Sequence, residues 1–167
     1  MSRAFVKEDS GGLDPLPDLP ISPHPNYVTP SGLADLRARL AATQATLAAL
    51  RARPERLDKL PEAAAERDIR YLEARLRPAL QVDPADQPGD EVSFGATVTV
   101  QDDDGHTTTY RITGEDEADA ARGWIAPHSP LARALLGARV GDEVEWRRPN
   151  GSLSLQIVAI RAWPETP

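Results

Sequence analysis

A leucine repeat bounded by prolines is the feature that most constrains how this chain of 167 residues can fold. Between Pro30 and Pro54, residues recur at alternating spacings of three and four, which is typical of a helix with one buried seam. The seam positions are Leu33, Leu36, Leu40, Thr43, Leu47 and Leu50. Thr29 and Pro30 supply a hydroxyl N-cap and a proline at the first helical position, so we expect a helix over residues 30–53.

A second helix is predicted over residues 61–77, between Pro61 and Pro78. Its seam continues the same alternation through Ala65, Ile69, Leu72 and Leu76. The short connection between the helices favours an antiparallel coiled-coil hairpin over residues 29–80 of a monomer. A leucine seam can also pair between chains, so a self-associating coiled coil is the alternative.

The segments on either side of the hairpin are rich in proline. The prolines of residues 10–30 forbid a helix or a central strand there, so residues 1–28 are expected to be either a disordered tail or an arm packed on the domain. Residues 81–90, QVDPADQPGD, read as a linker.

The hydrophobic period changes to two after this linker. Apolar residues alternate with polar ones from Val92 to Val100, an Asp-Gly turn follows, and an Asn-Gly turn at residues 150–151 precedes SLSLQIVAI. A short helix is expected after Ser129. Residues 91–163 are therefore predicted to form a small antiparallel sheet with one helix, which makes the chain an α+β protein.

Composition narrows the classes of partner and location. The net charge of −7 makes free duplex DNA a poor partner, because binding to bare phosphates needs excess positive charge. The absence of cysteine excludes disulfides and thiolate metal sites. Without an apolar run long enough to span a bilayer, or an apolar signal core in MSRAFVKEDSGG, we expect a cytoplasmic protein that does not contact membranes.

Motifs for chemistry of the chain's own are lacking. His24, His106 and His128 lie in separate segments without metal-ligand spacing. The acidic run before Gly105 is not an EF-hand, because aligning that glycine places Val100 at the first ligand position. No nucleophile elbow or phosphate-binding loop is present, so the residues alone predict a binding protein.

Four motifs in the second half carry a family resemblance. They are VSFGATVTV (92–100), YRITGEDEAD (110–119), IAPHSPLARALLG (125–137) and GDEV (141–144). In this order and spacing they resemble the Gre family of bacterial transcript-cleavage and elongation factors, GreA and GreB. The opening MSRAFVKED is also similar to the start of some GreB-like proteins.

The resemblance implies a two-part protein that works on bacterial RNA polymerase. In the family, a C-terminal domain with an FKBP-like fold docks on the rim of the polymerase secondary channel, and the hairpin enters that channel. In this chain the resemblance assigns the docking on polymerase to His128, Ser129, Pro130, Leu131 and Arg133. RNA and DNA would then be met only within the transcription complex.

The tip of the hairpin departs from the family pattern. Gre cleavage factors carry Asp-Leu-x-Glu-Asn there, and its carboxylates help to hold a second Mg²⁺ for RNA hydrolysis. Here the tip offers only Glu55, Asp58 and Glu62, and the helices are short. We therefore expect a regulator that is not an enzyme, binds no cofactor alone, meets Mg²⁺ only together with polymerase, and does not promote efficient cleavage.

Two alternatives remain. Tip carboxylates could still support cleavage by the polymerase, as in an active Gre factor. An FKBP-like fold could also catalyse prolyl isomerisation, which requires an aromatic-lined pocket. The aromatic residues of this half are instead expected to be core and surface anchors; they are Phe94, Tyr110, Trp124, Trp146 and Trp163.

Overall fold

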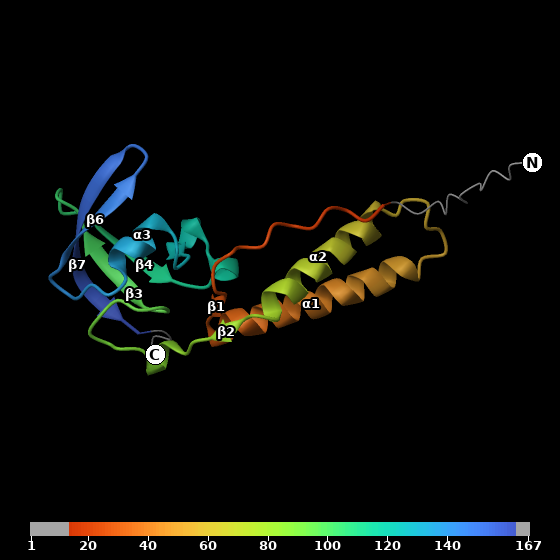
Figure 1. Cartoon of the computed structure of the whole chain (residues 1–167), viewed down its shortest axis with the longest axis horizontal. Helices are drawn as coiled ribbons and strands as arrows, with labels where there is room; N and C mark the ends of the chain where they lie inside the picture. Colours follow the sequence, from red (N-terminus) through yellow and green to blue (C-terminus); the bar gives the residue numbers. More distant parts are fainter. Residues whose placement is uncertain (1–13, 163–167) are drawn as a thin grey trace, which may run out of the picture.

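Two long helices extend from one end of a small curled sheet (Figure 1). The computed structural model describes residues 14–162, so the MSRAFVKED stretch and Trp163 lie outside the described residues. Helix α1 spans Pro30–Arg51 and α2 spans Leu60–Leu76. The mixed helix-and-sheet class predicted from the sequence is confirmed.

The helix boundaries follow from local chemistry. The Gly32 amide donates to Thr29 Oγ1 at 3.0 Å, which caps α1. Helix α1 ends at Arg51, two residues before the predicted end, because a residue that precedes proline, here Arg53, is disfavoured in the helical region. Helix α2 begins at Leu60, whose amide donates to Asp58 Oδ1 at 2.9 Å.

The leucine seam packs α1 against α2 within one chain. Leu36 and Leu72 are buried in a shared cluster with Val28, and Leu33, Leu40, Tyr71, Leu76 and Ala79 pack around them. Leu47 is buried nearer the far end of α1. Burial of this seam stabilises the pair of helices far more than intrinsic helix propensity does.

A parallel pair of very short strands joins the flanking segments. Strand β1, Tyr27–Val28, pairs with β2, Leu80–Gln81. The stretch predicted as a linker, residues 81–90, therefore starts inside a sheet, and it continues with a 3₁₀ turn, η1, at Pro84–Asp86. Pro84 in that turn is buried, so this stretch is packed against the domain rather than an open connection.

The main sheet has five strands in the order β5-β4-β3-β7-β6. The strands are β3 Thr97–Gln101, β4 Thr107–Ile112, β5 Trp124–Ile125, β6 Glu143–Arg148 and β7 Gly151–Arg161. The pairs β3–β4, β3–β7 and β6–β7 are antiparallel as predicted. The β4–β5 pair is parallel, because the chain between them returns through two 3₁₀ turns, η2 Glu115–Glu117 and η3 Ala120–Arg122.

One short helix, α3 at Pro130–Leu135, closes the core of this sheet. Its Leu131, Ala132 and Leu135 are buried in the same cluster as the inward residues of the strands. These strand residues are Val98, Val100, Ile112, Leu155 and Ile157. Within residues 14–162, no helix combines the length and the apolar character that crossing a bilayer would require.

Candidate functional site

An apolar groove of about 570 Å³ opens on the sheet domain beside α3. Its walls come from β4, β5, the start of α3, β6 and the β6–β7 turn. The lining residues are Tyr110, Ala120, Gly123, Ile125, Ser129, Pro130, Leu131, Trp146, Arg147, Arg148, Pro149 and Asn150. An apolar floor with two arginines and an asparagine at its edge is the composition of a protein-binding hot spot.

Strong curl of the sheet creates this groove. Tyr110 on β4 and Trp146 on β6 are separated by two intervening strands, which in a flat sheet would be roughly 14 Å. Their ring centroids are nevertheless only 6.5 Å apart, in an edge-on arrangement. A β-bulge where β3 pairs with β7, next to Val158, adds to the local twist.

The start of α3 forms one wall of the groove. The Ala132 amide donates to Ser129 Oγ at 3.2 Å, so Ser129 is the N-cap, and Pro130 occupies the first turn. Leu131 is buried, whereas Pro130 is exposed. The buried leucine therefore anchors an exposed Ser-Pro edge.

Three of the five predicted docking residues line this groove: Ser129, Pro130 and Leu131. Arg133 is exposed on α3 but is not part of the lining. The His128 ring points elsewhere, because it stacks on His24 with a centroid separation of 3.9 Å and its Nε2 lies 2.5 Å from Glu115 Oε1.

Sequence reasoning missed the opposite wall. Tyr110 and Trp146 were expected to be anchors and not to line a cleft, which is wrong because the curl of the sheet brings them together. Arg148 lies two positions after Trp146, on the same face of β6, and its guanidinium sits 5.3 Å from the indole centroid. An aromatic residue followed two positions later by an arginine is therefore the sequence signal that could have indicated this wall of the groove.

At the hairpin tip, the three candidate carboxylates have different environments. Glu62 is buried, and Arg56 donates to it from Nε at 2.8 Å and from Nη2 at 2.5 Å. Those hydrogen bonds lower the pKa of Glu62 against the opposing effect of burial. Asp58 is engaged by the Leu60 amide, and Glu55 is exposed.

Mg²⁺ is usually held by one or two carboxylates together with substrate phosphates, and the pairing of Glu62 with Arg56 leaves Asp58 and Glu55 as the less encumbered carboxylates of the tip. The apex of the tip presents an apolar side chain, because Leu57 is 94% exposed. Among the described residues, the one grouping of three possible metal ligands lies elsewhere, in the β3–β4 turn. There Asp102 Oδ1 already accepts the amides of Asp104 and His106, as expected for a hairpin turn.

Acidic residues of η2 fasten the helices to the sheet domain. Arg75, whose side chain is only 2% exposed, donates from Nε to Asp116 Oδ2 at 2.7 Å, and its Nη2 lies 3.4 Å from Glu115 Oε2. The Tyr71 hydroxyl donates to Asp116 Oδ1 at 2.6 Å. Burial, together with this hydrogen bond, raises the pKa of Tyr71 to about 12.

The third acidic residue, Glu117, binds the start of α1. Thr29 Oγ1 donates to Glu117 Oε1 at 2.5 Å, and the Gly114 amide donates to Oε2 at 3.1 Å. We call the set Thr29, Arg75, Glu115, Asp116 and Glu117 the joint. Three acidic side chains of the GEDEAD motif therefore connect the helices to the sheet domain.

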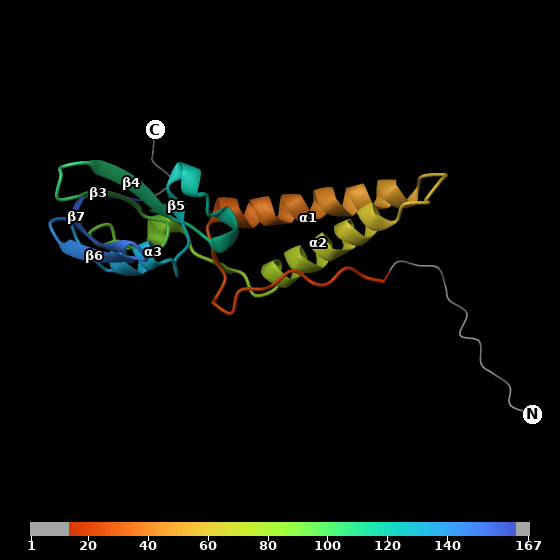
Figure 2. The ribbon, with the colours of Figure 1, turned by 90° about the horizontal axis from the view of Figure 1, so that it is seen from above.

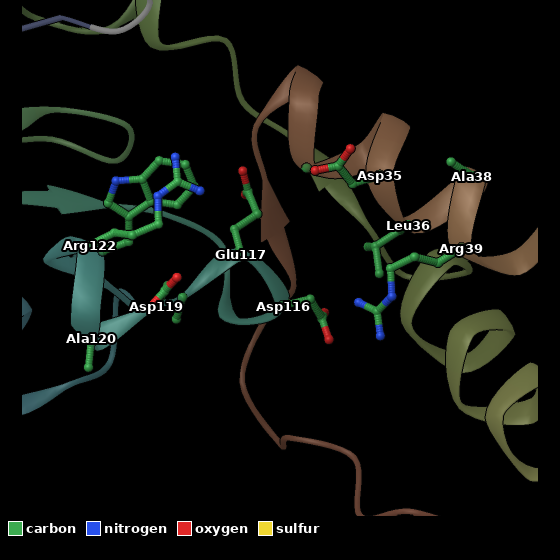
Figure 3. A pocket seen from close by; sticks show the side chains of 12 residues that line it. Asp35, Leu36, Ala38, Arg39, Asp116, Glu117, Asp119, Ala120 and Arg122 are labelled. Atoms are coloured by element: carbon green, nitrogen blue, oxygen red, sulfur yellow. The ribbon is translucent and has the colours of Figure 1, made fainter.

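A hollow of about 660 Å³ lies beside the joint, between α1 and residues 116–124 (Figure 3). Asp35 and Arg39 of α1 form one wall, and Figure 3 shows Asp116 and Glu117 on the η2 side. Arg122 closes the far end, stacked 3.6 Å from the Trp124 ring centroid. Its walls carry four carboxylates, Asp35, Asp116, Glu117 and Asp119, against two arginines, so acidic groups predominate even though Asp116 and Glu117 are already engaged in the joint.

Comparison with known proteins assigns the chain to a family. The family model described as "Transcription elongation factor, GreA/GreB, C-term" matches residues 87–162. The chain is 39% identical over 154 residues to transcription elongation factor GreB of Xanthomonas axonopodis pv. citri, covering 80% of this chain and 89% of that protein. It is 41% identical over 140 residues to transcription elongation factor GreA of Sphingopyxis alaskensis, covering 72% of this chain and 85% of the relative.

Solved structures of related factors also match. GreA factor homolog 1 of Thermus thermophilus is 24% identical with a TM-score of 0.41, covering 83% of this chain and all of that one (100%). A GreA/GreB factor from Nitrosomonas europaea is 23% identical with a TM-score of 0.40, covering 81% of this chain and 98% of the other. On the sequence relationships, the chain belongs to the GreA/GreB family of transcription elongation factors.

Proposed function

We propose that this protein binds bacterial RNA polymerase through the groove beside α3 and places its helical hairpin in the secondary channel without promoting efficient RNA cleavage. Family membership supports polymerase as the partner. The groove supports the docking site, since Ser129, Pro130 and Leu131 line it together with Tyr110 and Trp146. Nucleic acid would be contacted only inside the transcription complex, and the factor would act in the cytoplasm as a monomer.

One observation carries the absence of cleavage: the Arg56 guanidinium occupies both carboxylate oxygens of Glu62. A guanidinium bound to both oxygens places a positive charge beside the carboxylate, which opposes the approach of a metal cation to Glu62. Asp58 accepts the Leu60 amide through Oδ1 alone, so the second oxygen of Asp58 and the exposed Glu55 are the other tip candidates. Among the described residues, the tip carboxylates do not come together as a group of three possible metal ligands, which supports a tip that does not complete a two-metal centre.

The length of the hairpin also supports the absence of efficient cleavage, because a short hairpin reaches less far into the secondary channel than the longer one that the resemblance implies for Gre cleavage factors. Helix α1 has 22 residues and α2 has 17, so the longer one reaches roughly 33 Å at about 1.5 Å per residue. We infer that Mg²⁺ is bound, if at all, jointly with polymerase and not by the isolated protein.

Cleavage is tested on a stalled, backtracked elongation complex at neutral pH with Mg²⁺. The expected result is RNA of unchanged length after addition of this protein, while a cleavage-competent Gre factor shortens the RNA in a parallel reaction. Shortening by this protein would establish the alternative, an active factor that uses its tip carboxylates.

Docking is tested by capture of core polymerase on immobilised protein. We expect capture to fall for the double variant Ser129→Ala with Pro130→Ala, and for Arg147→Glu, whose side chain is 85% exposed at the edge of the groove. Gln156→Glu, an exposed position on β7 outside the groove, is the charge-changing control and should capture normally. Normal capture by both groove variants would exclude this docking surface.

Prolyl isomerase activity is a second candidate, favoured by the aromatic pair Tyr110 and Trp146 in an apolar groove. It leaves the helical hairpin without a role, so we rank it below polymerase docking. A peptide isomerisation assay decides: we expect no acceleration by the wild type, and acceleration abolished by Trp146→Ala would establish the enzyme.

Self-association is the remaining alternative for the leucine seam. Leu36, Leu47 and Leu72 are already buried within one chain. We therefore expect a sedimentation coefficient that does not change with protein concentration.

A further inference from the structure

The proline-rich segment 14–26, which we call the strap, runs alongside α2 toward the sheet domain (Figures 1 and 2). It has no helix or strand of its own. Five prolines within the strap restrict its backbone to extended conformations, so little entropy is lost when it is held straight.

One end of the strap is fastened to the middle of α2. Arg70 donates from Nε to Asp18 Oδ1 at 2.6 Å and from Nη2 to the Leu16 carbonyl at 2.9 Å. Leu19 of the strap helps to line a hollow together with Tyr71 and Leu72. The strap is thus held on the hairpin by the two hydrogen bonds from Arg70, and half-buried Leu19 faces the same hollow as Tyr71 and Leu72.

The other end of the strap is fastened to the sheet domain. Ser22 Oγ donates to Glu115 Oε1 at 2.8 Å. Two residues later, the His24 ring stacks on the His128 ring with an interplanar angle of 17°. Pro23 and Pro25 flank His24, which limits the directions in which its ring can move.

His128 directly precedes the groove edge formed by Ser129 and Pro130. We propose that His24 is a positioning residue for the docking groove, and that the strap braces the hairpin against the sheet domain so that groove and hairpin keep one relative orientation. The roughly 19 Å available to the six residues from Asp18 to His24 at about 3.1 Å each form a tie that cannot lengthen much.

The strap shares two residues with the joint, because Ser22 binds Glu115 and Asn26 binds Arg75, and it adds a contact with the sheet domain outside the joint, the stack of His24 on His128. A structure held by the joint alone could pivot about those contacts, whereas a second fastening at His128 restricts that rotation. The structural part of this proposal does not depend on the proposed function; its effect on polymerase binding does.

The test measures the distance between two spin labels in the free protein. The chain contains no cysteine, so Ala48→Cys on α1 and Ser152→Cys at the start of β7 provide two exposed labelling sites. Double electron–electron resonance on the labelled parent should give one narrow distance distribution. His24→Ala should broaden it, and His24→Phe should restore it, because a phenyl ring can still stack on His128.

His106→Ala is the matched control, since His106 is an exposed histidine in the β3–β4 turn and should leave the distribution narrow. An unchanged distribution for His24→Ala would overturn the brace. So would a distribution for His24→Phe as broad as that for His24→Ala, because stacking would then not be what holds the domains.

The consequence for polymerase is measured separately by the affinity for core enzyme. When two parts must engage together, a looser connection lowers the effective concentration of the second part. We expect His24→Ala to bind severalfold more weakly and His24→Phe to bind as the parent does. A parent that fails to bind polymerase would refute the proposed function, while the distance measurement would still decide the brace.

Discussion

The hydroxyl of Thr29 donates a 2.5 Å hydrogen bond to Glu117, a residue 88 positions away in the sequence. The same hydroxyl accepts the Gly32 amide, so one side chain both starts α1 and attaches it to the sheet domain. The Glu117 carboxylate also lies at the positive end of the α1 dipole, where an acceptor for the first-turn groups is stabilising.

Removing the Thr29 hydroxyl should weaken both the N-cap of α1 and the attachment of α1 to the sheet domain. We expect Thr29→Val to lower the free energy of unfolding by about 1–2 kcal/mol, the range for loss of an N-cap, and Thr29→Ser to change it by less than about 0.5 kcal/mol. Chemical denaturation followed by circular dichroism measures both. Equal losses for the two variants would show that the hydroxyl is not responsible.

Gly32→Ala should lower the free energy of unfolding, whereas replacing glycine by alanine within a helix usually raises it. Alanine normally stabilises a helix by about 1 kcal/mol relative to glycine. At position 32 the added Cβ would overlap the Glu117 carboxylate and displace it. We expect Gly32→Ala to destabilise the wild type but to stabilise a Glu117→Ala background, as measured by a double-mutant cycle; stabilisation in both backgrounds would contradict the close approach.

Arg75 should be the costliest arginine to replace. Its buried guanidinium serves Asp116 and Asn26, with 2.6 Å from Nη2 to Asn26 Oδ1, so Arg75→Met leaves a carboxylate without its counter-charge. We expect a loss of about 3–5 kcal/mol in the free energy of unfolding. Arg70→Met, which breaks an exposed pair with Asp18, should cost no more than about 1 kcal/mol, and similar costs would argue against a special role for the joint.

Tyr71 should make stability depend on pH at the alkaline end. Its pKa of about 12 in the folded protein exceeds the roughly 10 of an unfolded tyrosine, so the stabilisation is complete below pH 10 and is lost as pH rises toward 12. Because the phenol is only partly buried, we expect a loss of about 1 kcal/mol across that window. Unfolding at pH 9 and pH 11 should show this extra loss in the wild type and not in Tyr71→Phe, and identical slopes would contradict the raised pKa.

Arg56 should control the ionisation of Glu62. The hydrogen bonds from Arg56 hold the pKa of Glu62 below its ordinary value, so this stabilisation is present above the unfolded pKa and is lost as acidification passes through the folded pKa. Arg56→Gln should raise the Glu62 pKa, measured by carbon NMR of the carboxyl group. Its stability should also fall less between pH 6 and pH 3 than that of the wild type. A Glu62 pKa unaffected by the substitution would remove the basis for calling this carboxylate occupied.

The helical part could be predicted because its information is local. The Thr29 cap, the alternating leucines and Pro54 each act within a few residues. The same local logic identified Ser129 as the start of α3. Helix ends and seams are therefore accessible to sequence reasoning even without a structure.

Contacts between residues far apart in the sequence could not be predicted from the sequence. Charged residues such as Glu115 and Asp116 are usually solvated, so GEDEAD gave no sign that it meets a buried Arg75 forty positions earlier. Tyr110 and Trp146 meet because of the accumulated curl of five strands, which no alternation pattern encodes. Glu62 was a tip candidate by position alone, and its pairing with Arg56 depends on how residues 52–59 turn.

The helical hairpin is fixed to the sheet domain at its base, and its tip lies at the far end of the two helices. Over the 22 residues of α1, a rotation of about 5° at the joint displaces the far end by roughly 3 Å, which is the length of a hydrogen bond. A few short contacts between η2 and the helix bases thus set the direction of an apex whose Leu57 is almost fully exposed within the described residues. Angular stiffness at the joint and at the strap, more than the chemistry of the apex itself, decides which atoms Leu57 can reach.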